Sequence, residues 1–146
     1  MMEDKHYNIF SAFAQTADRR GNNTAVIYLG TRYSYLKLKD LSERFASALQ
    51  DIGVRRGQRV MLYIPNGIQW VVSWLGIQRA DAVSVPITPI YTPHDLRYIA
   101  NDSEAEAIIC ADTNFGYVKS VLPDTRIKTV RGSALMPMVS ITPAKS

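Results

Sequence analysis

The sequence predicts an α/β fold in which a parallel βαβαβ sheet layer follows an amino-terminal helix and a β-hairpin. From residue 57 onward, short apolar runs of strand length alternate with longer segments of helical periodicity. Strands joined by helices of that length need crossover connections, which make the sheet parallel. The 146 residues are 47% apolar and 21% charged, so they can build one core and fall outside the disordered class.

The first elements are a helix and a hairpin. Asn8 is placed to cap a helix whose apolar residues recur at three-four spacing, and Gly21 marks its end. Residues 25–29 and 32–34 are rich in β-branched and aromatic side chains and flank a turn containing Gly30. This arrangement is typical of a β-hairpin.

A second helix is expected between Ser34, its cap, and Gly53, its left-handed stop. Asp40 and Arg44 stand in the favourable i, i+4 order, which predicts a solvated ion pair rather than a site. The buried face is expected to hold five apolar residues: Leu38, Leu41, Phe45, Leu49 and Ile52.

The βαβαβ region begins after Gly57. Its helix at residues 68–80 is apolar on most sides, with a polar strip at Gln69 and Ser73, so it must be covered on more than one side. The strands are expected at residues 59–64, 82–87 and 107–111.

Capping residues also predict the helices that follow. Thr92 precedes Pro93 and is followed three residues on by Asp95, a capping box with Asp in place of Glu. Leu96, Ile99 and Ala100 form the expected buried face of that helix. A last short helix starts near Phe115 and is stopped by Pro123, and residues 127–130 are a candidate for one further strand.

Composition excludes several classes of protein. The single cysteine, Cys110, excludes an intrachain disulfide and a cysteine-based zinc site. The longest nearly unbroken apolar stretch, residues 70–77, is far below the ~20 residues that span a bilayer, and the charged first six residues do not resemble a signal peptide. We therefore expect a cytoplasmic protein without a transmembrane segment. The net charge of +4 is small and dispersed, and no nucleic-acid module is present, so no nucleic-acid partner is expected.

Phosphate-binding glycine loops are missing from the sequence. No pair of its eight glycines fits G-x-G-x-x-G or G-x-x-x-x-G-K-[ST]. Gly53 and Gly57 enclose Arg55 and Arg56, with Arg59 just beyond, and this basic loop is either an anion contact or a solvated connection. The solvated connection is favoured, because short basic patches are weak signals.

Other candidate groups also favour structural roles. His6 lies near the amino terminus and His94 in the first turn of a capped helix, where exposure to solvent is favoured over catalysis. Cys110, within an apolar strand, is favoured as a buried hydrophobe rather than a nucleophile. Packing is favoured over ligand stacking for the tyrosines at positions 28, 33, 63, 91 and 98. We therefore assign no catalytic, cofactor-binding or metal-ligating residue to this chain.

A series of short runs, in order along residues 8–130, is similar to the opening of a known superfamily. The most specific is Pro86-Ile87-Thr88-Pro89-Ile90-Tyr91-Thr92. The others are Asn23-Thr24-Ala25-Val26-Ile27, Tyr33-Ser34-Tyr35-Leu36-Lys37-Leu38, Pro65-Asn66-Gly67, and the runs at 53–60, 76–83 and 96–103. Together they resemble the adenylate-forming (AMP-binding) superfamily, the acyl-CoA synthetases, and most closely its fatty-acyl and medium-chain branch.

The resemblance implies the first lobe of the large domain of a two-domain acyl-CoA synthetase. Residues 1–130 would form that incomplete lobe, and residues 131–146 an unpatterned tail. Such enzymes couple a carboxylate to ATP as an acyl-adenylate and transfer the acyl group to coenzyme A. Their phosphate loop, ribose-binding acid, magnesium-binding glutamate and catalytic lysine all lie beyond the matched segment. ATP, magnesium and coenzyme A are thus implied for the family, and none of them for this chain.

Two positions depart from the family pattern. Lys37 stands where the capping box after Ser34 usually has Glu, which removes one reciprocal bond at a cost of about 0.5–1 kcal/mol. Asp81 stands where the helix-to-strand turn usually has Gly. If that position requires positive φ, Asp tolerates it better than most residues but still strains the turn.

Three hypotheses follow for the function. The first is an amino-terminal piece of an acyl-CoA synthetase (a fatty-acid–CoA ligase) that is inactive alone. The second is an interaction subunit that completes a separately encoded ligase remainder, or self-associates, through apolar surface around the helix at 68–80. The third is a free-standing small-ligand-binding domain, because sheets of this kind bind ligands at the carboxyl ends of their strands.

Overall fold

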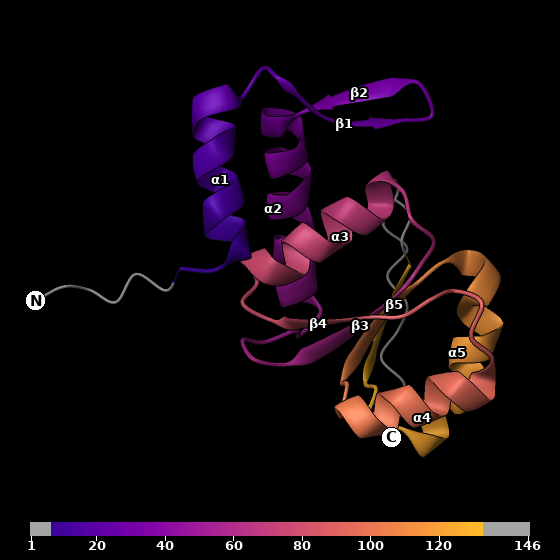
Figure 1. Ribbon diagram of the computed structural model, residues 1–146. Helices are drawn as coiled ribbons and strands as arrows, with labels where there is room; N and C mark the ends of the chain where they lie inside the picture. The colour runs from indigo at the N-terminus through magenta and orange to yellow at the C-terminus, as the bar shows by residue number, and fades with distance from the viewer. Residues whose placement is uncertain (1–6, 133–146) are drawn as a thin grey trace, which may run out of the picture.

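The computed structural model describes residues 7–132 as a four-stranded parallel sheet with helices on both faces and a separate hairpin (Figure 1). The helices are α1 (Ile9–Arg20), α2 (Tyr35–Asp51), α3 (Ile68–Arg79), α4 (Pro93–Ser103) and α5 (Phe115–Val121). The strands are β1 (Thr24–Tyr28), β2 (Thr31–Ser34), β3 (Arg59–Tyr63), β4 (Val83–Pro86), β5 (Ala107–Cys110) and β6 (Thr129–Gly132). The predicted α/β class and element order are confirmed.

The sheet has the strand order β4-β3-β5-β6, and every neighbouring pair is parallel. Successive residues of its central strands alternate between two cores. Leu62 and Ile109 face a core shared with α1, α2 and α3, whereas Met61 and Ile108 face a core shared with α4 and α5. Burial on both faces explains why these strands read as continuous apolar runs. No helix within residues 7–132 is long and apolar enough to cross a membrane.

The predicted helix caps are all confirmed. Asn8 Oδ1 accepts from the Ser11 N–H at 3.0 Å, and Ser34 Oγ accepts from the Lys37 N–H at 3.1 Å. The Thr92 N–H donates to the Asp95 carboxylate at 2.9 Å. Each of these hydrogen bonds joins a side chain to a backbone N–H three residues away, so the local sequence is enough to predict the caps.

One prediction about α3 is wrong: Ser73 is buried and is not part of a polar strip. Helix α2 packs against the side of α3 that carries Gly76, one turn after Ser73. A Cβ atom at Gly76 would lie 2.7 Å from Phe45 Cδ1 and 3.2 Å from the Ser42 carbonyl oxygen, so the helices approach closely there. The sequence correctly predicts that this apolar helix is covered on more than one side. One of the covered sides carries a serine, which the sequence pattern placed in a polar strip.

The hairpin turn lies one residue earlier than predicted. Leu29 and Gly30, with φ of 48° and 81°, form the turn, and Tyr28 pairs with Thr31. Two successive residues at positive φ are typical of the type I′ turn that suits strand twist. The sequence pattern predicts the turn at Gly30-Thr31, because Leu29 continues the apolar run of the first strand. Leucine is rarely found at positive φ, so its place in the turn is not expected from the sequence.

The candidate strand at residues 127–130 is present as β6, shifted to Thr129–Gly132. Ile127 is buried just before the strand, and the Lys128 N–H donates to the Glu106 carbonyl at 2.8 Å. The strand continues past residue 130, the expected end of the lobe. Residues 133–146 of the expected tail lie outside the described residues, as does His6.

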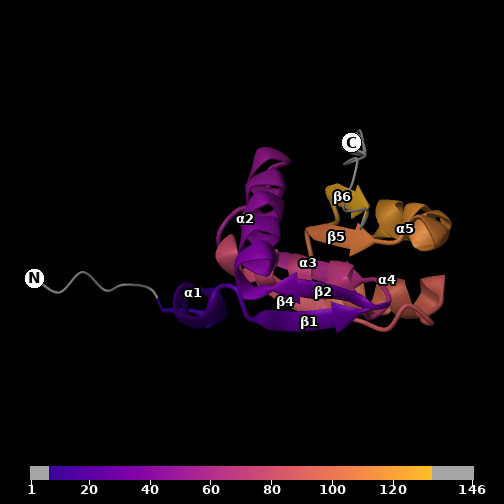
Figure 2. The ribbon, with the colours of Figure 1, turned by 90° about the horizontal axis from the view of Figure 1, so that it is seen from above.

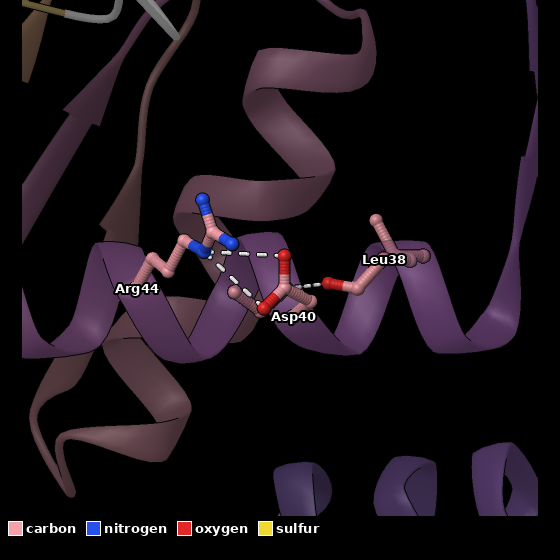
Figure 3. Close-up of polar contacts among 4 residues, drawn as sticks. Leu38, Asp40 and Arg44 are labelled. Atoms are coloured by element: carbon pink, nitrogen blue, oxygen red, sulfur yellow. Dashed lines mark hydrogen bonds and ion pairs between the residues drawn. The ribbon is translucent and has the colours of Figure 1, made fainter.

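The predicted ion pair on α2 is confirmed: Arg44 Nε donates to Asp40 Oδ1 at 3.2 Å (Figure 3). The Arg44 side chain is largely exposed and the Asp40 side chain is about half exposed. Close to this pair, Ser42 Oγ donates to the Leu38 carbonyl at 2.7 Å. A surface pair of this kind contributes only about 0.3–0.5 kcal/mol, and its position is that of a solvated face.

Candidate functional site

The sheet topology selects one place as the default ligand site. Strand β3 enters the sheet first, β4 is added on one side of it and β5 on the other. In open parallel sheets of this kind, ligands bind outside the carboxyl ends of the two strands between which the direction changes. That switch point lies between β3 and β5, next to the connections at residues 64–67 and 111–114.

The connection from β4 to α4, residues 87–92, crosses this switch point and is fixed there by two hydrogen bonds. Tyr63, fully buried at the end of β3, donates its hydroxyl to the Tyr91 carbonyl at 2.7 Å. Asn114, after β5, donates from Nδ2 to the Pro89 carbonyl at 3.1 Å. The protein's own chain therefore takes up the Tyr63 hydroxyl and the Asn114 amide at the crevice.

A groove of about 420 Å³ remains beside this connection. Its lining consists of the end of β3, the start of α3 and the chain after β4: Ile64, Pro65, Asn66, Trp70, Pro86, Ile87, Thr88 and Pro89. No side chain in this lining is charged, so the groove offers neither an acid–base pair nor charge neutralisation for a phosphate. Its chemistry suits contact with apolar groups.

The basic loop at Gly53–Gly57 does not present its backbone to an anion. Gly53 and Gly57 adopt positive φ, but their N–H groups donate to the Gln50 and Asp81 carbonyls. The N–H of Arg55 donates to Gln58 Oε1 at 2.8 Å. A phosphate cradle needs several free N–H groups, and here the loop's own fold uses them. The arrangement agrees with the solvated connection favoured by the sequence.

The other sequence candidates lie apart from one another. His94 is exposed at the start of α4, whereas Cys110 is buried in β5. Burial, and secondarily the nearby Asp112 charge, raises the pKa of the Cys110 thiol to about 12, so it is no thiolate nucleophile near neutral pH. No cluster of His, Cys, Asp or Glu suited to a metal ion occurs among residues 7–132.

Asp81 does occupy a positive-φ position, with φ of 55°. Its carboxylate accepts a hydrogen bond from Asn8 Nδ2 at 2.8 Å, and the same amide donates to the Gln78 carbonyl at 2.9 Å. Asn8 thus caps α1 with its oxygen and ties α1 to the end of α3 with its nitrogen. The aspartate gains a partner that glycine would lack, which offsets part of the backbone strain.

Arg131 is a buried residue that sequence reasoning assigned to the tail. Only 4% of it is exposed, and burial lowers the pKa of its guanidinium. Its Nη2 has no hydrogen-bond partner among the described residues. Arginine side chains are mostly exposed in proteins, so the sequence does not predict that Arg131 is buried on edge strand β6.

The strand order and the crossovers define a doubly wound α/β lobe whose switch point lies between β3 and β5. Residues 13–142 match the family described as AMP-binding enzyme. Over 129 residues, the chain is 33% identical to a long-chain-fatty-acid–CoA ligase of Escherichia coli O6:H1, covering 87% of this chain and 23% of that protein.

Solved structures give the same result. A long-chain-fatty-acid-CoA ligase from Archaeoglobus fulgidus superposes with a TM-score of 0.79 at 27% identity, over 86% of this chain and 27% of that one. A Mycobacterium tuberculosis fatty acyl CoA synthetase gives 0.82 at 24% identity, over 89% and 27%, and supports the fold alone.

This chain belongs to the AMP-binding enzyme family. It spans about a quarter of the length of the curated relatives it matches and corresponds to their amino-terminal segment. Neither the groove beside residues 87–92 nor the Gly53–Gly57 loop fits ATP and magnesium, because the groove is uncharged and the loop uses its own N–H groups. We therefore derive no catalytic step from them.

Proposed function

We propose that this chain supplies the amino-terminal lobe of an ATP-dependent fatty-acid–CoA ligase and catalyses no reaction by itself. The complete reaction would join a carboxylate to coenzyme A through an acyl-adenylate. One observation carries the proposal: a family match over most of the chain is combined with coverage of only 23% of the matched ligase. ATP, magnesium and coenzyme A would be bound by the remaining three quarters of such an enzyme.

Adenylation needs phosphate positioning and charge neutralisation within one closed site. The uncharged groove beside residues 87–92 supplies neither of these. The lobe instead supplies a rigid wall, because Tyr63 and Asn114 fix the connection across the carboxyl edge of the sheet. A scaffolding role within a larger enzyme agrees with this geometry.

The test is an assay of the purified chain with ATP, magnesium, coenzyme A and fatty acids of several lengths. We expect no acyl-CoA and no AMP above background, under conditions in which the Escherichia coli ligase forms both. ATP- and CoA-dependent acyl-CoA formation by this chain alone would refute the proposal.

A second candidate role is an interaction subunit that completes a ligase remainder carried on another chain. Partly buried Trp70 and Trp74, stacked with ring centroids 6.0 Å apart on α3, favour it. Co-expression with a chain that carries the phosphate loop tests this role. The absence of a complex in size-exclusion chromatography, together with the absence of restored activity, rejects it.

The third hypothesis, a free-standing ligand-binding domain, has the least support. The switch-point crevice is crossed by residues 87–92, and the groove left beside them is uncharged. A thermal-shift screen with ATP, AMP, coenzyme A and fatty acids is expected to show no stabilisation, whereas a saturable shift with any of them would revive this hypothesis.

A further inference from the structure

A cavity at the amino-terminal edge of the parallel sheet is lined by three arginines. Its volume is about 470 Å³, and it lies where α2 and α3 end and where β3 and β4 begin (Figures 1 and 2). Arg55 and Arg56 come from the connection before β3, whereas Arg79 is the last residue of α3. Local sequence patterns link only the first two, because Arg79 reaches the cavity through the fold. This edge of the sheet is opposite to the switch point between β3 and β5.

Backbone hydrogen bonds fix the two sources of arginine against each other. The Gly57 N–H donates to the Asp81 carbonyl at 2.9 Å, which ties the connection before β3 to the end of α3. Val54 is buried, and its N–H donates at 2.9 Å to a carbonyl in the last turn of α2. The loop that carries Arg55 and Arg56 is therefore ordered before any ligand binds, which lowers the entropic cost of binding.

Arg79 is placed beside an aromatic ring. Its guanidinium carbon lies 5.7 Å from the centroid of the Phe10 ring, which belongs to the buried core. A cation over a ring is attracted without using a hydrogen bond, so this contact leaves the N–H groups of Arg79 available. The three arginine side chains are all exposed, and a ligand reaches them without a rearrangement of the lobe.

The arginines of this cavity lack the carboxylate partners that other arginines have. Arg44 pairs with Asp40, and Arg97 pairs with Asp124. Within residues 7–132, no hydrogen bond or ion pair involves the three guanidinium groups of the cavity. Asp81 is the one acidic residue among the described residues of the lining, and its carboxylate accepts a hydrogen bond from Asn8. The lining therefore carries three positive charges against one negative charge.

The ends of α2 and α3 offer another explanation for basic residues at this place, because carbonyl groups at helix carboxyl ends attract cations. Here the backbone N–H groups of residues 52–54 occupy carbonyls at the end of α2, and those of residues 80–82 occupy carbonyls at the end of α3. Among the described residues, none of the three guanidinium groups bonds to these carbonyls. Helix capping therefore does not explain why the three arginines meet.

We propose that this cavity binds a phosphate group, either as the free ion or as the phosphomonoester of a small molecule. A phosphate dianion carries enough acceptor oxygens for several guanidinium groups, whose planar arrangement of N–H donors matches phosphate geometry. The volume of the cavity is typical of small-molecule sites, so an esterified group fits beside the phosphate. The inference is independent of the proposed function, because the site requires only the fold of this lobe.

The test is a calorimetric titration of the purified chain with inorganic phosphate and with glycerol 3-phosphate, at fixed ionic strength near pH 7.5. Acetate is the control for a singly charged anion. We expect saturable binding of both phosphate compounds and none of acetate. Tighter binding of glycerol 3-phosphate than of inorganic phosphate would assign the site to an ester, and the reverse order to the free ion. Absence of saturable binding by both compounds overturns the proposal.

Variants locate the binding in the cavity. Arg55→Gln and Arg79→Gln should each raise the dissociation constant for the tighter phosphate compound by on the order of tenfold, because each removes a charged donor. Arg32→Gln, on the exposed hairpin, removes the same charge outside the cavity and should leave binding nearly unchanged. Thermal unfolding without phosphate verifies that each variant is folded. Equal weakening by all three substitutions would indicate general charge attraction and would overturn the site, as would binding that none of them changes.

Discussion

Asn8 links two helices through one amide group. Its Oδ1 caps α1, and its Nδ2 bonds the Asp81 carboxylate and the Gln78 carbonyl at the end of α3. We expect Asn8→Ala to lower the free energy of unfolding by about 1–2 kcal/mol, because a cap and two interhelical bonds are lost. Chemical denaturation measures this change, with Asn22→Ala, in an exposed turn, as the control. Equal effects of the two substitutions would show that the bonds contribute nothing.

Asp95 makes the start of α4 sensitive to acid. Hydrogen bonds from the Thr92 backbone and hydroxyl hold the pKa of the Asp95 carboxyl below its ordinary value of 3.8. Because the folded-state pKa is the lower one, the contribution is present above pH 3.8 and is lost as the pH falls through the folded value. The difference in unfolding free energy between wild type and Asp95→Asn should therefore narrow in acid. A difference that is constant with pH would contradict the capping assignment.

Cys110 is expected to be inert in the folded chain. Burial raises the pKa of its thiol from 9.0 to about 12, so folding favours the neutral form. The corresponding stability is present below pH 9.0 and is lost as the pH rises toward the folded value. A disulfide reagent at pH 8 should label the thiol at the rate of unfolding, and at once in denaturant. Rapid labelling of the folded chain would place Cys110 at the surface.

At the scale of elements, the contact between α2 and α3 depends on Gly76. A Cβ there would lie 2.7 Å from the buried Phe45 ring, so Gly76→Ala should destabilise the chain by about 1–3 kcal/mol through overpacking. Gly116, inside α5, has nothing within 4 Å of an added Cβ. Gly116→Ala is therefore expected to raise stability by up to about 1 kcal/mol. Thermal unfolding of both variants tests the prediction. If both substitutions raise the stability, the close contact between Gly76 and Phe45 is contradicted.

The sequence predicts elements well where local rules decide them. Asn8, Ser34 and Thr92 cap their helices as expected, because a cap needs only a suitable residue and its neighbours. The hairpin turn was misplaced by one residue, because Leu29 adopts a conformation that leucine rarely takes. Long-range packing determines the rest. Ser73 is buried although it is polar, and Tyr63 and Asn114 hold residues 87–92 across the switch point although they lie far apart in the sequence.

At the scale of the molecule, the resemblance to acyl-CoA synthetases is confirmed as family membership, and the expected lobe is confirmed as a fold. The arrangement of the candidate site, in contrast, could not be predicted from the sequence. Local sequence patterns do not predict that residues 87–92 cover the switch point, because Tyr63 and Asn114, which hold that connection, lie far from it in the sequence. The burial of Arg131 cannot be predicted from local sequence patterns either. It depends on the segments that pack around edge strand β6.

The central claim is that the lobe contributes to ligase activity only as part of a larger assembly. Its most direct test is fatty acyl-CoA formation by three samples: this chain, the downstream Escherichia coli ligase segment, and the two combined. The account predicts ATP- and CoA-dependent product from the combination and none from either sample alone. Product from this chain alone, or no product from a stable complex of the two when the Escherichia coli segment restores activity, would contradict it.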